Sequence, residues 1–198
     1  MRKAFRLAAL FSALLFGAAG LSHAQSPAPD DSARAERQAE ALIATEIEAM
    51  RARLAPYAPH LSSNPELVRI ARSRAAALAH GAPFSHRDWV GQVPAVDMVQ
   101  ARFGPYGFIG ENIVMEMRGG RGFDANAFAK FAADQWMASQ EHRDNILSPE
   151  FDASGIGVAV FGDSAYAAQI FRGPAPPVPR VRPPRPKGAD AVWAPGGF

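Results

Sequence analysis

Three side chains with the chemistry of metal ligands stand in separate parts of this 198-residue sequence. His86 ends the segment Pro-Phe-Ser-His, Glu111 lies in Gly-Glu-Asn, and His142 lies in the polar run Ser-Gln-Glu-His-Arg-Asp-Asn that begins at Ser139. Neutral imidazole and carboxylate groups suit zinc. If the fold brings the three segments together, we expect a site for a divalent cation, with zinc, calcium and magnesium as the candidates.

Spacing alone leaves another interpretation open, in which each histidine only caps a helix or bonds locally. The sequence has no H-E-x-x-H, C-x-x-C or G-x-S-x-G motif. Asn112 beside Glu111, and Ser139 and Glu141 near His142, are further candidates for the same cleft. His142 is expected one turn beyond a helix end, where helix carbonyls favour the protonated imidazole.

The start of the chain is typical of a secretory signal peptide. Three basic residues precede an apolar run from Leu7 to Leu21, and small residues follow at Ser22 and Ala24. The alternative, a membrane anchor, fits less well because the run is short and rich in Ala and Gly. We therefore expect residues 1–24 to be removed. The protein is expected to be exported to the periplasm or the extracellular space, with no transmembrane anchor after cleavage.

Residues 25–173 are long enough for a single domain with its own core. The chain has no cysteine, so disulfides cannot contribute to stability. Without the signal peptide, 18 basic and 19 acidic residues remain, and residues 25–173 alone carry a net charge of −4. This charge gives no sign of a nucleic-acid partner.

The last segment, residues 174–198, has a different composition from the rest. It contains eight prolines and four basic residues against one acidic residue. Such a composition favours an extended, disordered tail outside the core. The tail is either a spacer or a basic contact for an anionic component of the cell envelope.

Between these ends, periodicity predicts helices and then strands. Helical patterns cover residues 33–54 and 64–80, and a third helix follows Asp124. Strand patterns cover residues 109–117, 155–161 and 165–172, of which the last two form a hairpin. This order indicates an α+β fold, with helices packed on a small antiparallel sheet.

Taken in chain order, six segments resemble a bacterial member of the CAP superfamily, also called the SCP or sperm-coating-protein domain. They are NPELVRIARSRAAALA, FSH, GENI, W-x-x-S-x-x-H-R-x-N-I-L, GIGVA and Y-x-x-Q-I-F. The resemblance covers roughly residues 40–172. It implies an αβα sandwich and a cleft in which two histidines and two acidic residues can bind a divalent cation.

Three of those four cleft positions match here, as His86, Glu111 and His142. The fourth does not match, because Ser139 stands where many relatives have a glutamate. A site with three ligands leaves positions open for water and binds metal more weakly. A second departure is Glu48, which stands where the family commonly has a structural asparagine.

The resemblance implies a secreted binding module, since relatives are reported to bind sterols, fatty acids or other small hydrophobic molecules. The methionines in Val114-Met115-Glu116-Met117 are then either an adaptable apolar wall or plain core residues. A metal-dependent hydrolase using the same cleft is the enzymatic alternative. A third possibility is an envelope-interaction module that works through the basic tail.

Overall fold

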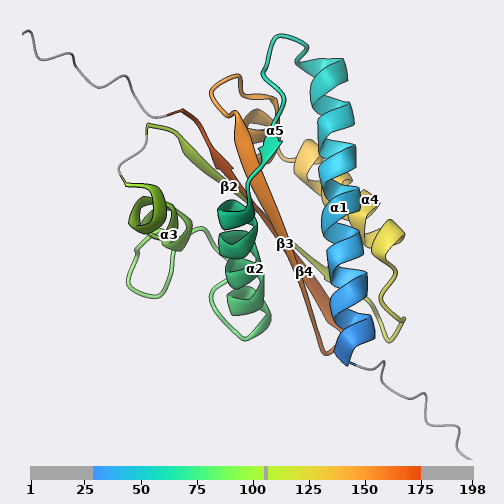
Figure 1. Cartoon of the computed structure of the whole chain (residues 1–198). Coiled ribbons are helices and arrows are strands. Elements are labelled where there is room, and N and C mark those ends of the chain that lie inside the picture. Colours follow the sequence, from blue (N-terminus) through green and yellow to red (C-terminus); the bar gives the residue numbers. More distant parts are fainter. Residues whose placement is uncertain (1–28, 105–106, 175–198) are drawn as a thin grey trace, which may run out of the picture.

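A computed structural model describes residues 29–104 and 107–174 of the protein (Figure 1). The predicted signal peptide, residues 1–24, lies outside the described residues, as does the proline-rich tail except for Pro174. Both therefore stay predictions. Within the described ranges, no helix is long and apolar enough to cross a membrane.

The described residues form five helices and four strands. The helices are α1 (Pro29–Leu54), α2 (Pro65–Ala79), α3 (Pro94–Phe103), α4 (Ala125–Ala138) and α5 (Gln140–Leu147). The strands are β1 (Ser62–Ser63), β2 (Ile109–Met117), β3 (Ala153–Phe161) and β4 (Ser164–Arg172).

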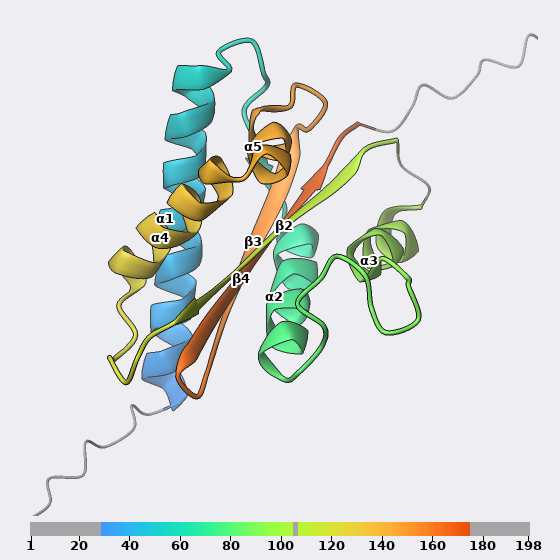
Figure 2. The same ribbon diagram turned by 180° about the vertical axis from the view of Figure 1, so that it is seen from behind.

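The four strands form one sheet in the order β1-β3-β4-β2. Strand β4 is antiparallel to both β2 and β3, whereas β1 runs parallel to β3. Helices α1, α4 and α5 cover one face, and α2 and α3 cover the other (Figures 1 and 2). The predicted αβα sandwich of the α+β class is confirmed, although short β1 makes the sheet mixed and not purely antiparallel.

Local sequence sets where helices α2 and α4 begin. The side chain of Asn64 accepts the backbone N–H groups of Glu66 at 2.9 Å and Leu67 at 3.2 Å. Asp124 caps α4 in the same way. These caps satisfy N–H groups that have no partner inside the helix. The predicted starts of both helices are therefore confirmed.

The structure differs from the sequence-based expectation in the polar run after α4. Ser139 ends α4 and precedes α5, so the run forms a helix of its own. His142 follows the C-terminus of α4 as expected, but it also lies in the first turn of a further helix, α5. Only Ile146 of α5 is buried, so the segment shows almost no apolar periodicity from which a helix could be predicted. Helix α3 and strand β1 are further elements that the sequence did not predict.

Two glycines of β3 let α2 lie directly on the sheet. A Cβ atom on Gly155 would stand 2.2 Å from the backbone carbon of Leu67, and one on Gly157 would stand 2.1 Å from the backbone nitrogen of Arg72. No side chain fits in this space, because backbone atoms cannot rotate away as a side chain can. The strand thus positions the helix from which Arg74 reaches the cleft described below.

We expect Gly157→Ala to destabilise the protein by about 1–3 kcal/mol or more, because α2 must move off the sheet to admit the methyl group. The free energy of unfolding in urea measures this loss. Gly122→Ala is the matched control, since nothing lies within 4 Å of its added Cβ atom and its backbone conformation is ordinary. Equal stability of the two variants would contradict the close packing of α2 on β3.

A buried arginine joins α1 to the turn between α5 and β3. One terminal nitrogen of Arg51 donates to the carbonyls of Ile146 and Ser148, and the other donates to those of Pro59 and Phe151. The residue is 2% exposed. Burial lowers the pKa of the Arg51 guanidinium. This contact holds α5, and with it His142, against the first helix.

Candidate functional site

The fold brings the three predicted ligand residues together at one end of β2. His86 comes from the loop after α2, Glu111 from β2 and His142 from α5. Nδ1 of His86 lies 2.8 Å from Oε2 of Glu111, and the centroids of the two imidazole rings are 5.8 Å apart. Residues separated by up to 56 positions in the chain therefore meet in one cluster.

Arg74 of α2 is a fourth member of this cluster that the sequence analysis missed. Its Nε lies 2.8 Å from Oε1 of Glu111, and one of its terminal nitrogens donates to the carbonyl of Ser85. The side chains of Arg74 and Glu111 are only 3% and 5% exposed. Both carboxylate oxygens of Glu111 are thus already engaged, one by a guanidinium and the other by His86.

A signal for Arg74 is present in the sequence. The buried residues of α2 recur at helical spacing, and Arg74 occupies one of these positions between Ala71 and Leu78. A charged side chain on the apolar face of a helix is almost never buried without a partner. The pattern thus indicates a buried acidic partner, but it does not say which one.

The surroundings of His142 disfavour its charged form. Burial is the largest cause and the neighbouring His86 the second, and together they lower the pKa of His142 against the opposing effect of Glu141 and Glu111. This direction is opposite to the one expected for a histidine beyond a helix C-terminus. A neutral imidazole keeps a lone pair available for a metal ion.

Two asparagines fix α5 against β2. Asn112, fully buried, donates to the carbonyl of His142 at 3.1 Å, and Asn145 donates to Oδ1 of Asn112 at 2.9 Å. Asn145 also donates to the carbonyl of Glu111 at 3.3 Å. Asn112 is therefore a buried residue that holds β2, with Glu111, against α5, with His142, and it has no exposed surface of its own.

A cavity of about 250 Å³ opens beside the cluster. Its lining includes His86, Glu111, Glu141, His142 and Asn145, and its apolar residues are Val93, Ala95, Val96 and Ile109. The predicted cleft candidate Glu141 thus lies in the wall, whereas Ser139 and Asn112 do not line the cavity.

The methionines of β2 fit neither of the two interpretations that the sequence left open. Met115 and Met117 are 37% and 71% exposed, so they are not core residues. They do not line the cavity either. They belong to the opposite end of β2 from Glu111, which explains why they contribute nothing to the cleft.

We expect the stability of the metal-free protein to fall as the pH is lowered from about 7 to about 5. Because the folded pKa of His142 lies below its ordinary value near 6.5, the unfolded chain takes up the proton first. The stabilising contribution is therefore present above that value and is lost as the pH falls toward the folded pKa.

Urea unfolding of the wild type and His142→Gln in EDTA, at several pH values, checks this dependence. The variant should show a weaker dependence, and the slopes should differ by at most about 1.4 kcal/mol per pH unit. Equal slopes for the two proteins would contradict the lowered pKa. His80→Gln is the control, since His80 lies outside the cavity.

The cluster does not form a complete metal cage. Within residues 29–104 and 107–174, no group of three or more histidine, cysteine, aspartate or glutamate side chains is arranged to hold a metal ion. The reason is visible in Glu111, whose two oxygens point to Arg74 and His86. The structure therefore supplies two imidazoles with an oriented carboxylate behind one of them.

Comparisons with known proteins agree with this architecture. The model of the cysteine-rich secretory protein family, CAP, matches residues 48–171. An extracellular protein containing an SCP domain from Bacillus anthracis matches with a TM-score of 0.57 and 22% identity, over 76% of this chain and 45% of that one. No curated protein matches the chain significantly.

Two further solved structures share the fold. An outer surface protein of Borrelia burgdorferi has a TM-score of 0.56 and 16% identity, over 69% of this chain and 93% of that one. A cysteine-rich secretory protein of Staphylococcus aureus has a TM-score of 0.51 and 19% identity, over 70% of this chain and 40% of that one. This chain thus spans less than half the length of the Bacillus and Staphylococcus proteins.

The matched range carries the site as well as the fold. Residues 48–171 are more than half of the chain, and they include Arg74, His86, Glu111 and His142. They also contain strands β1 to β3, all of β4 but its last residue, and all helices except most of α1. The chain therefore belongs to the CAP family, the family of cysteine-rich secretory proteins.

Proposed function

We propose that this protein is exported and acts as a binding module that holds a divalent cation between His86 and His142. The observation that carries the proposal is the bond from His86 Nδ1 to Glu111. Because the carboxylate accepts the proton of Nδ1, Nε2 of His86 carries the lone pair that a cation needs. A carboxylate behind a ligating histidine also fixes the orientation of the ring.

The donor set favours zinc over calcium and magnesium. Zinc accepts imidazole nitrogen, whereas calcium and magnesium prefer oxygen ligands. Arg74 balances the charge of Glu111, so this carboxylate attracts a cation less than a free one would. We therefore propose a zinc site of modest affinity, in which Glu111 acts through His86. When bound, the cation would act as a Lewis acid toward a polar group of the ligand.

The apolar residues in the wall of the cavity support the proposal of a small hydrophobic or lipid ligand beside the cation. Val93, Val96 and Ile109 supply apolar surface next to the histidines. Trp89 and Val90, in the loop that follows His86, are 82% and 78% exposed. Exposed large apolar side chains, and cavities lined by apolar groups, are each typical of ligand-binding regions.

A hydrolase is less well supported, because the serines near the histidines have other roles. The hydroxyl of Ser85 accepts the backbone N–H of Arg87 at 3.1 Å, which closes a local turn. Ser139 separates α4 from α5 and does not line the cavity. Among the described residues, no serine hydroxyl bonds to His86 or His142. A nucleophile and its base must meet through space.

Calorimetric titration of the chain from residue 25 onward with zinc tests the proposal. We expect one zinc per molecule, and far weaker binding of calcium and magnesium. The double variant His86→Ala, His142→Ala should lose this binding, whereas His80→Ala should retain it, since His80 lies outside the cavity. Zinc binding that survives in the double variant would place the ion elsewhere and refute the proposed site.

The same proteins separate the other proposals. Zinc-dependent binding of the fluorescent fatty acid cis-parinaric acid would support the lipid ligand, and peptide or ester hydrolysis that requires both histidines would favour the hydrolase. Removal of residues 174–198 tests the basic tail. If binding to anionic envelope polymers disappears only in the truncated protein, the tail and not the cleft is the envelope contact.

A further inference from the structure

Helix α1 lies along the edge of β3 beyond the two residues that pair with β1, and it supplies acceptors to the strand's backbone. Oε1 of Glu36 accepts the N–H of Val160 at 2.8 Å, and Oε1 of Glu40 accepts that of Val158 at 3.2 Å. Four helix residues rise about 6 Å and two strand residues about 6.8 Å, so the two spacings nearly match. Glu36 and Glu40, four positions apart in α1, therefore meet alternate N–H groups of β3.

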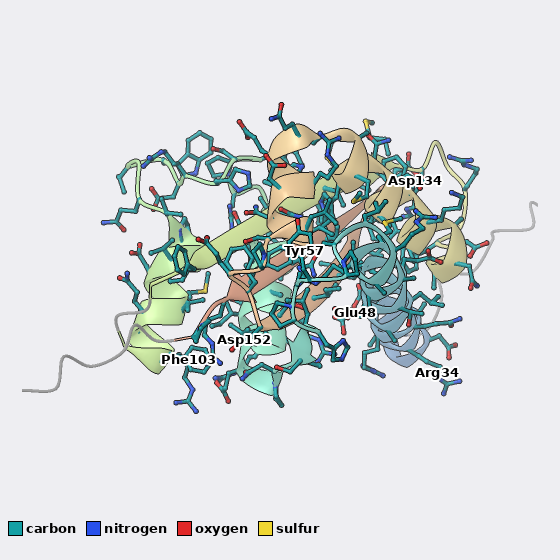
Figure 3. The ribbon with its side chains drawn as sticks, turned by 90° about the horizontal axis from the view of Figure 1, so that it is seen from above. Arg34, Glu48, Tyr57, Phe103, Asp134 and Asp152 are labelled. Carbon is teal, nitrogen blue, oxygen red and sulfur yellow. The ribbon has the colours of Figure 1, made fainter. Side chains whose placement is uncertain are left out.

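The series is interrupted at Ala44. Four residues beyond Glu40, the same spacing would place an acceptor at position 44, opposite Ile156. Position 44 is alanine, whose side chain has no acceptor. The series resumes at Glu48, whose Oε1 accepts the N–H of Leu61 at 3.1 Å. Figure 3 labels Glu48 beside α1, on the side toward α2. Because N–H groups alternate along a strand, that of Ile156 points to the same edge as those of Val158 and Val160.

A cavity of about 290 Å³ occupies this gap, and it shares no residue with the histidine cleft. Ala44 and Ile156 line it, together with Ser63, Arg72 and Gln169. Helices α1 and α2 form its two sides and the edge of the sheet its floor.

An unpaired acceptor faces the same space. Gln169 lies directly opposite Ile156 on β4 and is 1% exposed. Its Oε1 has no hydrogen-bond partner among the described residues, and its Nε2 reaches only the hydroxyl of Ser154 at 3.5 Å. Buried polar atoms are nearly always paired, so this oxygen indicates a donor that residues 29–104 and 107–174 do not supply.

Both glutamates around the gap are already paired, and the remaining cation of the lining, Arg37, is exposed. Glu40 bonds to Arg72 at 2.8 Å, and Glu48 bonds to His60. A carboxylate ligand would serve the N–H of Ile156 but would leave the oxygen of Gln169 unpaired, and it would stand between two glutamates. A group with one acceptor and one donor satisfies both positions.

We propose that this pocket, bounded by Ala44, Ile156 and Gln169, is a second binding site that takes a small amide such as a one- or two-residue peptide fragment. The carbonyl of the ligand accepts the N–H of Ile156. Its N–H group donates to Oε1 of Gln169. The site is independent of the cation and of the cleft around His86.

Nuclear magnetic resonance titration of the ¹⁵N-labelled chain with N-acetylglycinamide tests this site. We expect saturable shifts of the Ile156 backbone amide and the Gln169 side-chain amide, while acetate should give none. Ala44→Glu supplies the missing carboxylate and should abolish the shifts without loss of thermal stability. Ala49→Glu, an exposed change on the same helix outside the pocket, should leave binding unchanged.

Gln169→Leu provides a second test that adds no charge. Loss of one hydrogen bond should weaken binding of N-acetylglycinamide about threefold to tenfold, provided that the variant keeps the wild-type spectrum elsewhere. No saturable shift in the wild type, equal shifts in Ala44→Glu, or binding of acetate in place of the amide would overturn the proposal. Zinc binding at the cleft should be the same in Ala44→Glu, so the outcome is separate from that of the proposed cation site.

Discussion

Arg74→Met is expected to destabilise the protein by about 3–5 kcal/mol, one of the two largest single effects that we predict. The substitution removes the guanidinium that lies 2.8 Å from Glu111 and leaves a buried carboxylate without its charged partner. It also frees the carbonyl of Ser85, which the same side chain holds. Urea unfolding monitored by circular dichroism at pH 7 measures the loss.

The double variant Arg74→Met, Glu111→Gln is the control that isolates the charge. Removing both partners leaves no buried unpaired ion, so most of the lost stability should return. Exposed Arg69→Met, on the same helix, should change stability by no more than about 1 kcal/mol, because surface ion pairs contribute little. If Arg74→Met is no worse than Arg69→Met, the Arg74–Glu111 pair does not hold the site.

Arg51→Met is the second large effect, with an expected loss of roughly 2–6 kcal/mol. Two of the four carbonyls that Arg51 binds, those of Ile146 and Phe151, accept bonds in a buried environment. A buried acceptor left without a donor costs about 1–3 kcal/mol. The free energy of unfolding in urea measures the sum. We also expect weaker zinc binding, because the turn that follows α5 loses its attachment to α1.

Arg51→Lys separates charge from geometry. An ammonium group is a compact donor and cannot span carbonyls on both the Pro59 side and the α5–β3 side, as a planar guanidinium does. The lysine variant should therefore recover less than half of the loss. Arg53→Met, an exposed change in the same turn of α1, is the matched control. Full rescue by lysine would show that position 51 requires only a positive charge.

Arg74 and Arg51 determine the charge and the position of the groups that form the site. Arg74 neutralises Glu111 from α2, and Arg51 holds the α5 segment in place from α1. The cleft is thus supported from both layers of helices, and its lining combines the two imidazoles with Glu141, Asn145 and apolar groups. This arrangement supports the proposed weak zinc site beside an apolar ligand more than a fully coordinated metal.

Much of the candidate site could be predicted from the sequence. Local motifs singled out His86, Glu111 and His142, and the structure brings their segments together. The sequence does not show whether Glu111 could bind a metal directly, because this depends on which groups reach its two carboxylate oxygens. Arg74, 37 residues away in the chain, takes one of them, and no local pattern specifies such a pairing.

The sequence by itself determined the elements with strong local signals. Asn64 and Asp124 cap their helices, and alternation of apolar residues marks the hairpin of β3 and β4, because caps and periodicity act between near neighbours. The CAP resemblance then predicted the sandwich. These features need no knowledge of distant contacts.

Only the tertiary structure decided the features that depend on which distant groups meet. It made the polar run at 140–147 a helix, since Arg51 and Asn112 bind its carbonyls. It also lowered the pKa of His142 by burial, and it left a gap at Ala44 in the series of glutamates along β3. Burial and pairing arise when separate segments pack together, so they appear only once the whole chain is folded.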